Sequence, residues 1–177
     1  MHKDMPTPFK LTPDALASFE AMRDAFQSAP LLVHFDHSKP SFLHTDASDF
    51  AIAAILSQYG DDSELHPVAF YSRKLAPAEI NYDVHNKEML AVIQGLKEFR
   101  PWLSGTIIPI SVITDHKNLE YFMAQRQLNR RQARWMLELT EFNFRLSYAP
   151  GSKNPTDGPL HRDNYSPNQD DPTTAWK

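Results

Sequence analysis

Four acidic residues occur where strands are expected to end or helices to begin. They lie in "TDASDF" (45–50), "YDVHNKEML" (82–90), "ITDHKNL" (113–119) and "NPTDGP" (154–159), and they are Asp46, Glu88, Asp115 and Asp157. Crowded carboxylates repel one another unless a cation neutralises them. Carboxylate oxygens combined with water suit Mg²⁺ or Mn²⁺ and not Zn²⁺. Two such ions about 4 Å apart form the arrangement that catalyses in-line phosphodiester hydrolysis.

Each acid also has a structural explanation when it is considered alone. Asp46 could begin a turn, and Glu88 could be favoured by the positive end of a helix dipole. Asp115 could cap the helix that follows it, and a turn or a cap would also explain Asp157. The metal hypothesis therefore depends on whether the fold brings the acids together.

Apolar periodicity predicts the elements that would position these acids. Three strands in series with short connections are typical of an antiparallel meander, and two further strands follow among helices. The strands are expected at 41–47, 51–58, 66–75, 109–114 and 143–149. The helices are expected from Pro13 to Pro30, from Asp83 to Leu103, at 117–123 and at 129–142. In the last of these helices, Ala133, Leu137 and Thr140 are expected on the buried side.

The order of the elements predicts that the acids converge. A whole helix separates the first strand from the fourth, so these strands should be parallel neighbours joined by a right-handed crossover. Asp46 and Asp115 would then lie at adjacent strand ends, and Glu88 on the crossover helix would point at the same place. The expected fold class is α/β, with a five-stranded mixed sheet, three antiparallel strands then two more, flanked by helices.

Composition limits the classes to which the chain can belong. With 177 residues, of which 41% are hydrophobic, one domain with a real core is expected. We expect a leader and connecting helix at 1–40, the domain at 41–162, and a polar, disordered tail at 163–177. The absence of cysteine excludes disulfides and thiolate metal sites. No apolar run approaches the roughly 18 residues of a membrane span, and no signal peptide is expected.

The motifs together resemble the ribonuclease H domain, and specifically that of reverse transcriptases from gypsy-type LTR retrotransposons. Four stretches carry the resemblance: "SAPLLVHFDHSKPSFLHTDASDFAIAAILSQ", "HPVAFYSRKLAPAEINYDVHNKEMLAVIQGLKEFRPWL", "ITDHKNLEYF" and "LNRRQARWMLELTEFNFRLSYAPGSKNPTDGP". The resemblance runs from about Phe9 to Arg162 and covers a ribonuclease H-like fold with the short segment that connects it to a polymerase. The polymerase palm itself is absent.

The resemblance implies a function and a site. The chain would be a metal-dependent endonuclease that cuts the RNA strand of RNA–DNA hybrids during reverse transcription, using two Mg²⁺ or Mn²⁺ ions. The catalytic and metal-binding residues would be Asp46, Glu88, Asp115 and Asp157. Asp157 departs from the family pattern "ADALSR", because Gly158 and Pro159 follow it and Pro159 would disrupt a regular helix. The polymerase domain of the same polyprotein would be a partner, and the location would be intracellular, in a cytoplasmic virus-like particle or the nucleus.

Further residues are candidates for contacts with the substrate. Arginines near the start of the helix at 129–142 could clamp phosphates or could simply form a solvated face. Cellular ribonucleases H have a histidine before the last aspartate, whereas this sequence has none between Asn118 and Pro155. Tyr148 is the titratable residue just before the final loop at 150–155, although it could instead pack in the core. The candidates are Ser48, His116, Asn118, Arg130, Arg131, Arg134 and Tyr148.

Several alternatives remain open at this level. His116 could be a surface or capping residue. His34, Asp36 and His37 could form a zinc cluster or a loop of turn-forming residues. The net charge of −4 argues against strong unaided binding to nucleic acid. A catalytically weak or inactive protein-interaction module on the same fold is the main alternative function. Integrase-like chemistry is disfavoured by the order and spacing of the acids.

Overall fold

The computed structural model describes residues 11–28, 32–117, 119, 128–150 and 154–160, with the backbone alone at 25–28 and 157–158. It divides into two compact units, Met1–Leu31 and Leu32–Lys177. The first unit contains helix α1 (Pro13–Ser28), which begins as predicted, with the hydroxyl of Thr12 accepting from the Ala15 N–H at 3.3 Å. The start of the predicted leader and the predicted tail at 163–177 lie outside the described residues.

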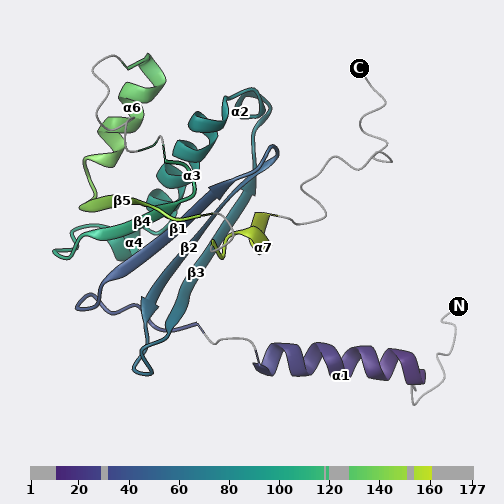
Figure 1. Cartoon of the computed structure of the whole chain (residues 1–177). Helices are drawn as coiled ribbons and strands as arrows, with labels where there is room; N and C mark the ends of the chain where they lie inside the picture. The colour runs from purple at the N-terminus through teal and green to yellow at the C-terminus, as the bar shows by residue number, and fades with distance from the viewer. Residues whose placement is uncertain (1–10, 29–31, 118, 120–127, 151–153, 161–177) are drawn as a thin grey trace, which may run out of the picture. The chain divides into compact units, whose positions relative to one another are not determined.

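The second unit is built on a five-stranded mixed sheet (Figure 1). The order of the strands is β3-β2-β1-β4-β5, in which β1 pairs antiparallel with β2 and parallel with β4. The meander, the crossover and the parallel pairing of the first and fourth strands were all predicted, and the structure confirms them. The strands are β1 (Ser41–Ala47), β2 (Ala51–Tyr59), β3 (Leu65–Lys74), β4 (Ile110–Thr114) and β5 (Phe144–Tyr148).

The crossover helix is shorter than predicted. Helix α3 covers Val84–Glu98 and is followed by the separate short helix α4 (Arg100–Leu103). Pro101 explains the break, since its ring would clash with the carbonyl one turn earlier in a continuous helix, whereas it is accepted in the first turn of α4. The short helix α2 (Pro77–Ile80) was not predicted. Among the helices of the described residues, none is long and apolar enough to cross a membrane.

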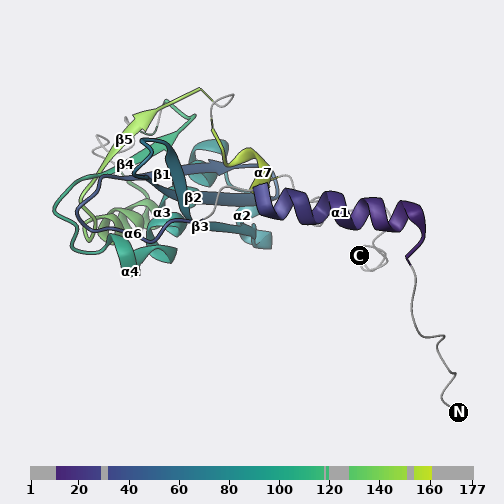
Figure 2. The ribbon, with the colours of Figure 1, turned by 90° about the horizontal axis from the view of Figure 1, so that it is seen from below.

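The two faces of the sheet are covered differently. Helix α3 packs on one face, where Leu43, Ile52 and Leu56 belong to the main core. The other face meets α7 (Asp157–Leu160), whose Leu160 forms a small cluster with Ala51 and Ala53. Figure 2 shows these two helices on opposite sides of the sheet. Because both faces of β2 are covered, eight of its nine residues are buried.

Helix α6 (Arg130–Leu139) buries a different side from the one predicted. Ala133, Leu137 and Thr140 are exposed, and the buried residues are Trp135 and Leu139. The reason lies in tertiary packing, since the Trp135 ring meets Tyr82 edge-on at 6.2 Å. Tyr82 directly precedes the Asp83 cap of α3, so this contact fixes α6 beside the start of the crossover helix.

Candidate metal centre

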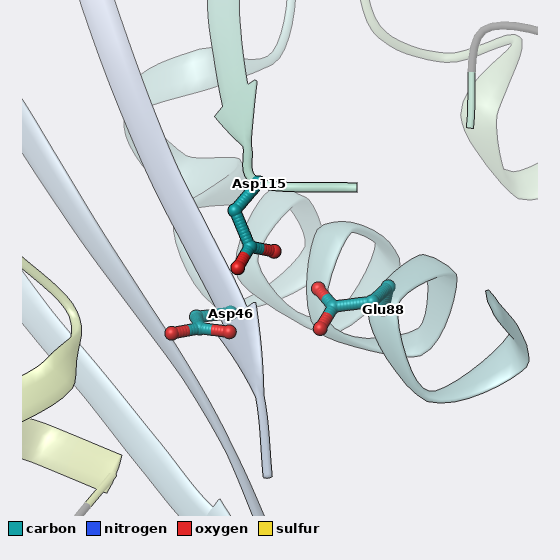
Figure 3. Close-up of side chains that lie close together, drawn as sticks. All are labelled: Asp46, Glu88 and Asp115. Atoms are coloured by element: carbon teal, nitrogen blue, oxygen red, sulfur yellow. The ribbon is translucent and has the colours of Figure 1, made fainter. Parts of the chain in front are cut away.

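Three of the four predicted acids meet at one end of the sheet (Figure 3). Asp46 lies near the end of β1, Asp115 follows β4, and Glu88 is at the start of the second turn of α3. Each contributes a carboxylate oxygen, and these oxygens all lie within 4.8 Å of one another. The predicted convergence is therefore confirmed, and it follows from the parallel pairing of β1 with β4.

Asp46 is held by backbone and hydroxyl groups. Its Oδ1 accepts a hydrogen bond from the Ala47 N–H at 2.8 Å. The Thr156 hydroxyl donates towards Oδ2 at 3.5 Å. Both contacts restrict the rotamer of the side chain, so the orientation of Asp46 is largely set before any ligand arrives.

Ser48 stabilises the turn that follows Asp46. Its hydroxyl oxygen accepts from the N–H groups of Phe50 and Ala51 at 3.3 and 3.0 Å. This is a Ser/Thr turn, in which the side-chain hydroxyl stabilises the tight connection between two strands. Ser48 therefore has a structural role in the hairpin, and its predicted contact with the substrate stays a prediction.

Glu88 is the buried member of the cluster, with only 3% of its surface exposed. Burial and the charges of Asp46 and Asp115 raise its pKa to about 9, and the Ala47 N–H opposes this by lowering the pKa. The Oε2 atom is buried and has no hydrogen-bond partner among the residues that the structure describes. Because an ionised carboxylate is expensive in such a place, Glu88 is neutral at pH 7 when no cation is bound.

The donor set fits a hard divalent cation. Three carboxylates supply oxygen ligands alone, which is the chemistry that Mg²⁺ and Mn²⁺ prefer. A cation would remove the repulsion between the three acids and would give the buried Oε2 of Glu88 a partner.

Asp157 starts helix α7, but its side chain lies outside the described residues, so its metal role stays a prediction. Pro159 does not disrupt this helix, in contrast to what its sequence position suggested. It lies in the first turn, where the N–H that proline lacks would have no partner in the helix.

The segment before α7 is anchored to β1, which the sequence reasoning missed. Asn154 and Thr156 are both buried. The Asn154 side-chain amide donates to the Thr45 carbonyl at 3.1 Å and its Oδ1 accepts from the Thr156 N–H at 3.3 Å. The chain is thereby fixed beside Asp46 just before Asp157. The turn-forming sequence Asn154-Pro155 was the available signal, but it could not reveal the partner strand.

The aromatic candidates have defined neighbours. Tyr148 is 41% exposed, so the alternative that it packs in the core is wrong. The Lys117 ammonium lies 4.7 Å from the centre of its ring. The ring of His116 contacts that of His85, an interaction that the sequence did not suggest. Asn118 lies outside the described residues.

The three arginine candidates divide into two groups. Arg130 and Arg134 are exposed on α6. The guanidinium of Arg131 instead stacks on Tyr82, with 3.8 Å between its central carbon and the ring centre, and lies 5.3 Å from the Trp135 ring centre. This packing gives Arg131 a structural role, and phosphate binding by any of the three remains a prediction.

The suggested zinc cluster is not formed. The Asp36 Oδ1 accepts from both the backbone N–H and the hydroxyl of Ser38, at 2.8 and 2.7 Å. Among the described residues, which include His34 and His37, the converging group of three or more histidine, aspartate or glutamate side chains is the cluster of Asp46, Glu88 and Asp115. The turn-forming explanation for this loop is therefore confirmed.

Comparisons with known proteins agree with this fold. Residues 36–142 match the model of the family described as the RNase H-like domain found in reverse transcriptase. The Transposon Tf2-3 and Tf2-4 polyproteins of Schizosaccharomyces pombe (strain 972 / ATCC 24843) are each 45% identical over 148 residues. These matches cover 82% of this chain but only 11% of each polyprotein, so the chain spans a small part of the length of its relatives.

Solved structures show the same fold. The foamy viral protease-reverse transcriptase in complex with RNA/DNA hybrid has a TM-score of 0.52 and 18% identity, covering 80% of this chain and 19% of that chain. The foamy viral protease-reverse transcriptase in complex with dsDNA has a TM-score of 0.56 and 17% identity. This match covers 81% of this chain and 30% of that chain. The likeness supports the predicted ribonuclease H-like arrangement of a five-stranded mixed sheet flanked by helices.

Proposed function

The chain belongs to the family of RNase H-like domains found in reverse transcriptase, and from this premise we propose that it is an endonuclease that hydrolyses the RNA strand of RNA–DNA hybrids during retrotransposon reverse transcription. One observation carries the proposal. Carboxylates from three separate elements converge within 4.8 Å, and the buried one has an oxygen without a partner in the described part of the chain. A fold does not by itself imply an activity, whereas such a constellation of side chains has a specific use.

Asp46, Glu88 and Asp115 would hold the metal, with Asp157 as the predicted fourth ligand and two Mg²⁺ or Mn²⁺ ions as the full complement. Such ions, when bound, activate the attacking water and stabilise the leaving oxygen. The Ala47 N–H and the Thr156 hydroxyl keep the Asp46 carboxylate oriented. A bound cation would offset the negative charge of the three acids, so Glu88 would release its proton when the metal binds. Metal affinity would therefore depend on pH.

The substrate proposal rests on the family and on the surface of α6. A foamy viral relative of this fold has been solved in complex with RNA/DNA hybrid. Exposed Arg130 and Arg134 would contact phosphates, and 2′-hydroxyl contacts would select the RNA strand.

We propose the partner and the location on the basis of the same family. Since the net charge is −4, the isolated chain would bind hybrid weakly, and a polymerase domain of the same polyprotein would supply further affinity. We place this activity inside the cell, in a cytoplasmic virus-like particle or in the nucleus.

Cleavage of an end-labelled RNA–DNA hybrid with Mg²⁺ tests the proposal, with single-stranded RNA and duplex DNA as substrate controls. The wild type should cut the hybrid RNA alone, and Asp46→Asn should lose on the order of 100-fold or more in rate. Asp61→Asn is the matched control, because that carboxylate is fully exposed on a distant turn. A folded wild type that binds hybrid without cutting it would favour the alternative of an inactive interaction module.

A further inference from the structure

Lys87 is a buried cation next to the acidic cluster. It directly precedes Glu88 in α3, and only 8% of its surface is exposed. Its ammonium donates to the main-chain carbonyl of Asp49 at 3.3 Å and to the Oδ1 atom of the same residue at 3.5 Å. Lysine is almost never buried to this degree without a partner, so its place in the fold requires an explanation.

The simplest explanation of a buried lysine is packing. The aliphatic part of the side chain can cover apolar surface while the ammonium stays in water. Here the ammonium does not end in water, because the Lys87 side chain is only 10% exposed. It ends on the turn that joins β1 to β2, three residues after Asp46. The contact therefore links the helix that carries one acid to the turn that follows another.

Lys87 and Glu88 leave α3 in different directions. Successive residues of a helix point about 100° apart, so Lys87 can reach the turn while Glu88 faces Asp46 (Figure 3). A donor that holds Asp49 against the start of α3 also fixes how far the end of β1 lies from Glu88. We propose that Lys87 is a positioning residue of the metal centre, which keeps Asp46 and Glu88 at the separation at which they bind one cation. This inference rests on the proposed function, because it assigns a role within the same site.

The Ala47 N–H shows how a displacement of the turn would reach both acids. It donates to the Asp46 Oδ1 at 2.8 Å, and it also acts on Glu88 as a hydrogen-bond donor. The next N–H, that of Ser48, donates to the Ala51 carbonyl at 2.8 Å. Because these hydrogen bonds join the turn to the ends of β1 and β2, a turn that moved away from α3 would carry the Ala47 amide with it.

The main-chain carbonyl of Asp49, and not its carboxylate, is the acceptor that matters. The Asp49 side chain is 83% exposed, and an exposed ion pair contributes little. Asp49→Asn keeps the carbonyl and should behave like the wild type. Lys87→Met keeps an unbranched chain and loses the donor, so it should release the turn. Lys97→Met is the matched control, because Lys97 is on the same helix and its contact with Glu138, at 3.5 Å, is partly exposed.

Amide hydrogen exchange in EDTA tests the contact without metal or substrate. The Ala47 amide should exchange at least several-fold faster in Lys87→Met than in the wild type or in Lys97→Met. The Leu56 amide, in the middle of β2, reports on unfolding of the whole sheet. A rise confined to Ala47 supports the proposal. An unchanged rate at Ala47, or an equal rise at both amides, would overturn it.

Calorimetric titration with Mg²⁺ tests the consequence for the site. Lys87→Met should bind Mg²⁺ roughly 10-fold more weakly than the wild type, since groups that orient metal ligands typically contribute a factor of about 10–100 to affinity. Asp49→Asn and Lys97→Met should keep the wild-type affinity. A lysine that only stabilised the fold would lower the melting temperature in EDTA and leave Mg²⁺ binding by the folded protein unchanged. That result would overturn the positioning role.

The cleavage assay separates this role from contact with the substrate. In Lys87→Met the Mg²⁺ concentration for half-maximal rate should rise by the same factor, while the KM for the hybrid at saturating Mg²⁺ stays unchanged. A raised KM with an unchanged Mg²⁺ dependence would contradict the proposal. Circular dichroism verifies folding, and Lys87→Gln, which is too short to reach Asp49, serves if Lys87→Met does not fold. A wild type that binds Mg²⁺ without cleaving the hybrid would refute the proposed function, whereas hydrogen exchange and the Mg²⁺ titration would still decide the role of Lys87.

Discussion

Gly95 of α3 lies directly against Ala54 of β2. A Cβ atom placed on Gly95 would be 2.8 Å from the Cβ of Ala54 and 3.6 Å from both methyl groups of Leu43. Real Cβ atoms do not approach so closely, so the glycine determines how near the crossover helix lies to the sheet. Glu88 is two turns earlier on the same helix, so this spacing also sets the depth of the buried carboxylate.

Gly95→Ala should therefore destabilise the protein. Overpacking costs about 1–3 kcal/mol, and the better helix propensity of alanine offsets up to about 1 kcal/mol of this. Urea denaturation should show a net loss, and Ala54→Gly in the same background should recover part of it. A double-mutant cycle without coupling would show that the helix moves freely and that the contact is unimportant.

The pKa of Glu88 predicts how the metal-free stability depends on pH. Its folded-state value is about 9, above the ordinary 4.5, so between these values the native state holds a proton that the unfolded chain has released. The free energy of unfolding should fall as pH rises through this range, by at most about 1.4 kcal/mol per pH unit for one proton. Below pH 4.5 this penalty is absent, and above pH 9 it is complete.

Glu88→Gln should remove this dependence, because glutamine does not titrate. In EDTA the variant should gain stability relative to the wild type as pH rises from 5 to 9. Glu64→Gln, at an exposed position just before β3, is the control and should follow the wild type. Parallel curves for the wild type and Glu88→Gln would show that the buried carboxyl does not take up a proton on folding.

Arg131 should contribute to stability more than its neighbours on α6. Arg131→Ala removes the stacking on Tyr82 and Trp135, which is worth roughly 0.5–2 kcal/mol. Arg130→Ala and Arg134→Ala remove exposed side chains and should change the unfolding free energy by less than about 0.5 kcal/mol. Equal losses in the three variants would mean that the stacking has no energetic weight.

The exposed arginines should instead affect hybrid binding. The double variant Arg130→Ala/Arg134→Ala should bind RNA–DNA hybrid more weakly, and the slope of log affinity against log salt should flatten by about 1–2. Fluorescence anisotropy across a salt series measures both quantities. An unchanged slope would assign these residues to an ordinary solvated face.

The sequence was sufficient to predict the acidic cluster because its determinants are local. The strand pattern and the length of the crossover predict that β1 lies between β2 and β4. This arrangement brings Asp46, Glu88 and Asp115 to the same end of the sheet. The depth of Glu88 was not predictable, since it depends on the contact between Gly95 and Ala54. Such close approaches are tertiary and leave no periodic signal.

The errors have a similar origin. The buried side of α6 was misassigned because Leu137 fits a helical stripe, whereas the partner surface offered by Tyr82 selects Trp135. The pairing of His85 with His116 joins residues 31 positions apart, and no local pattern connects them. The anchoring of Asn154 to Thr45 spans 109 positions in the same way.

The most demanding prediction concerns the acids as one metal site. Asp46→Asn keeps one oxygen, which can accept from the Ala47 N–H, and its NH₂ group can donate to the Thr156 hydroxyl, so the fold should survive. One negative charge is lost from the cluster. The metal-free variant should be at least as stable as the wild type, because repulsion is relieved. Mg²⁺ should no longer stabilise it, since a ligand that binds only the native state acts by mass action.

Asp157→Asn should give the same pattern if the fourth acid is also a ligand. Melting curves and cleavage rates, each with and without Mg²⁺, separate the possibilities. If Asp46 were merely structural, its replacement would cost on the order of 1 kcal/mol with or without metal. Full activity of Asp46→Asn would end the metal-site hypothesis. Full activity of Asp157→Asn alone would reduce the site to Asp46, Glu88 and Asp115, the three acids that converge in the structure.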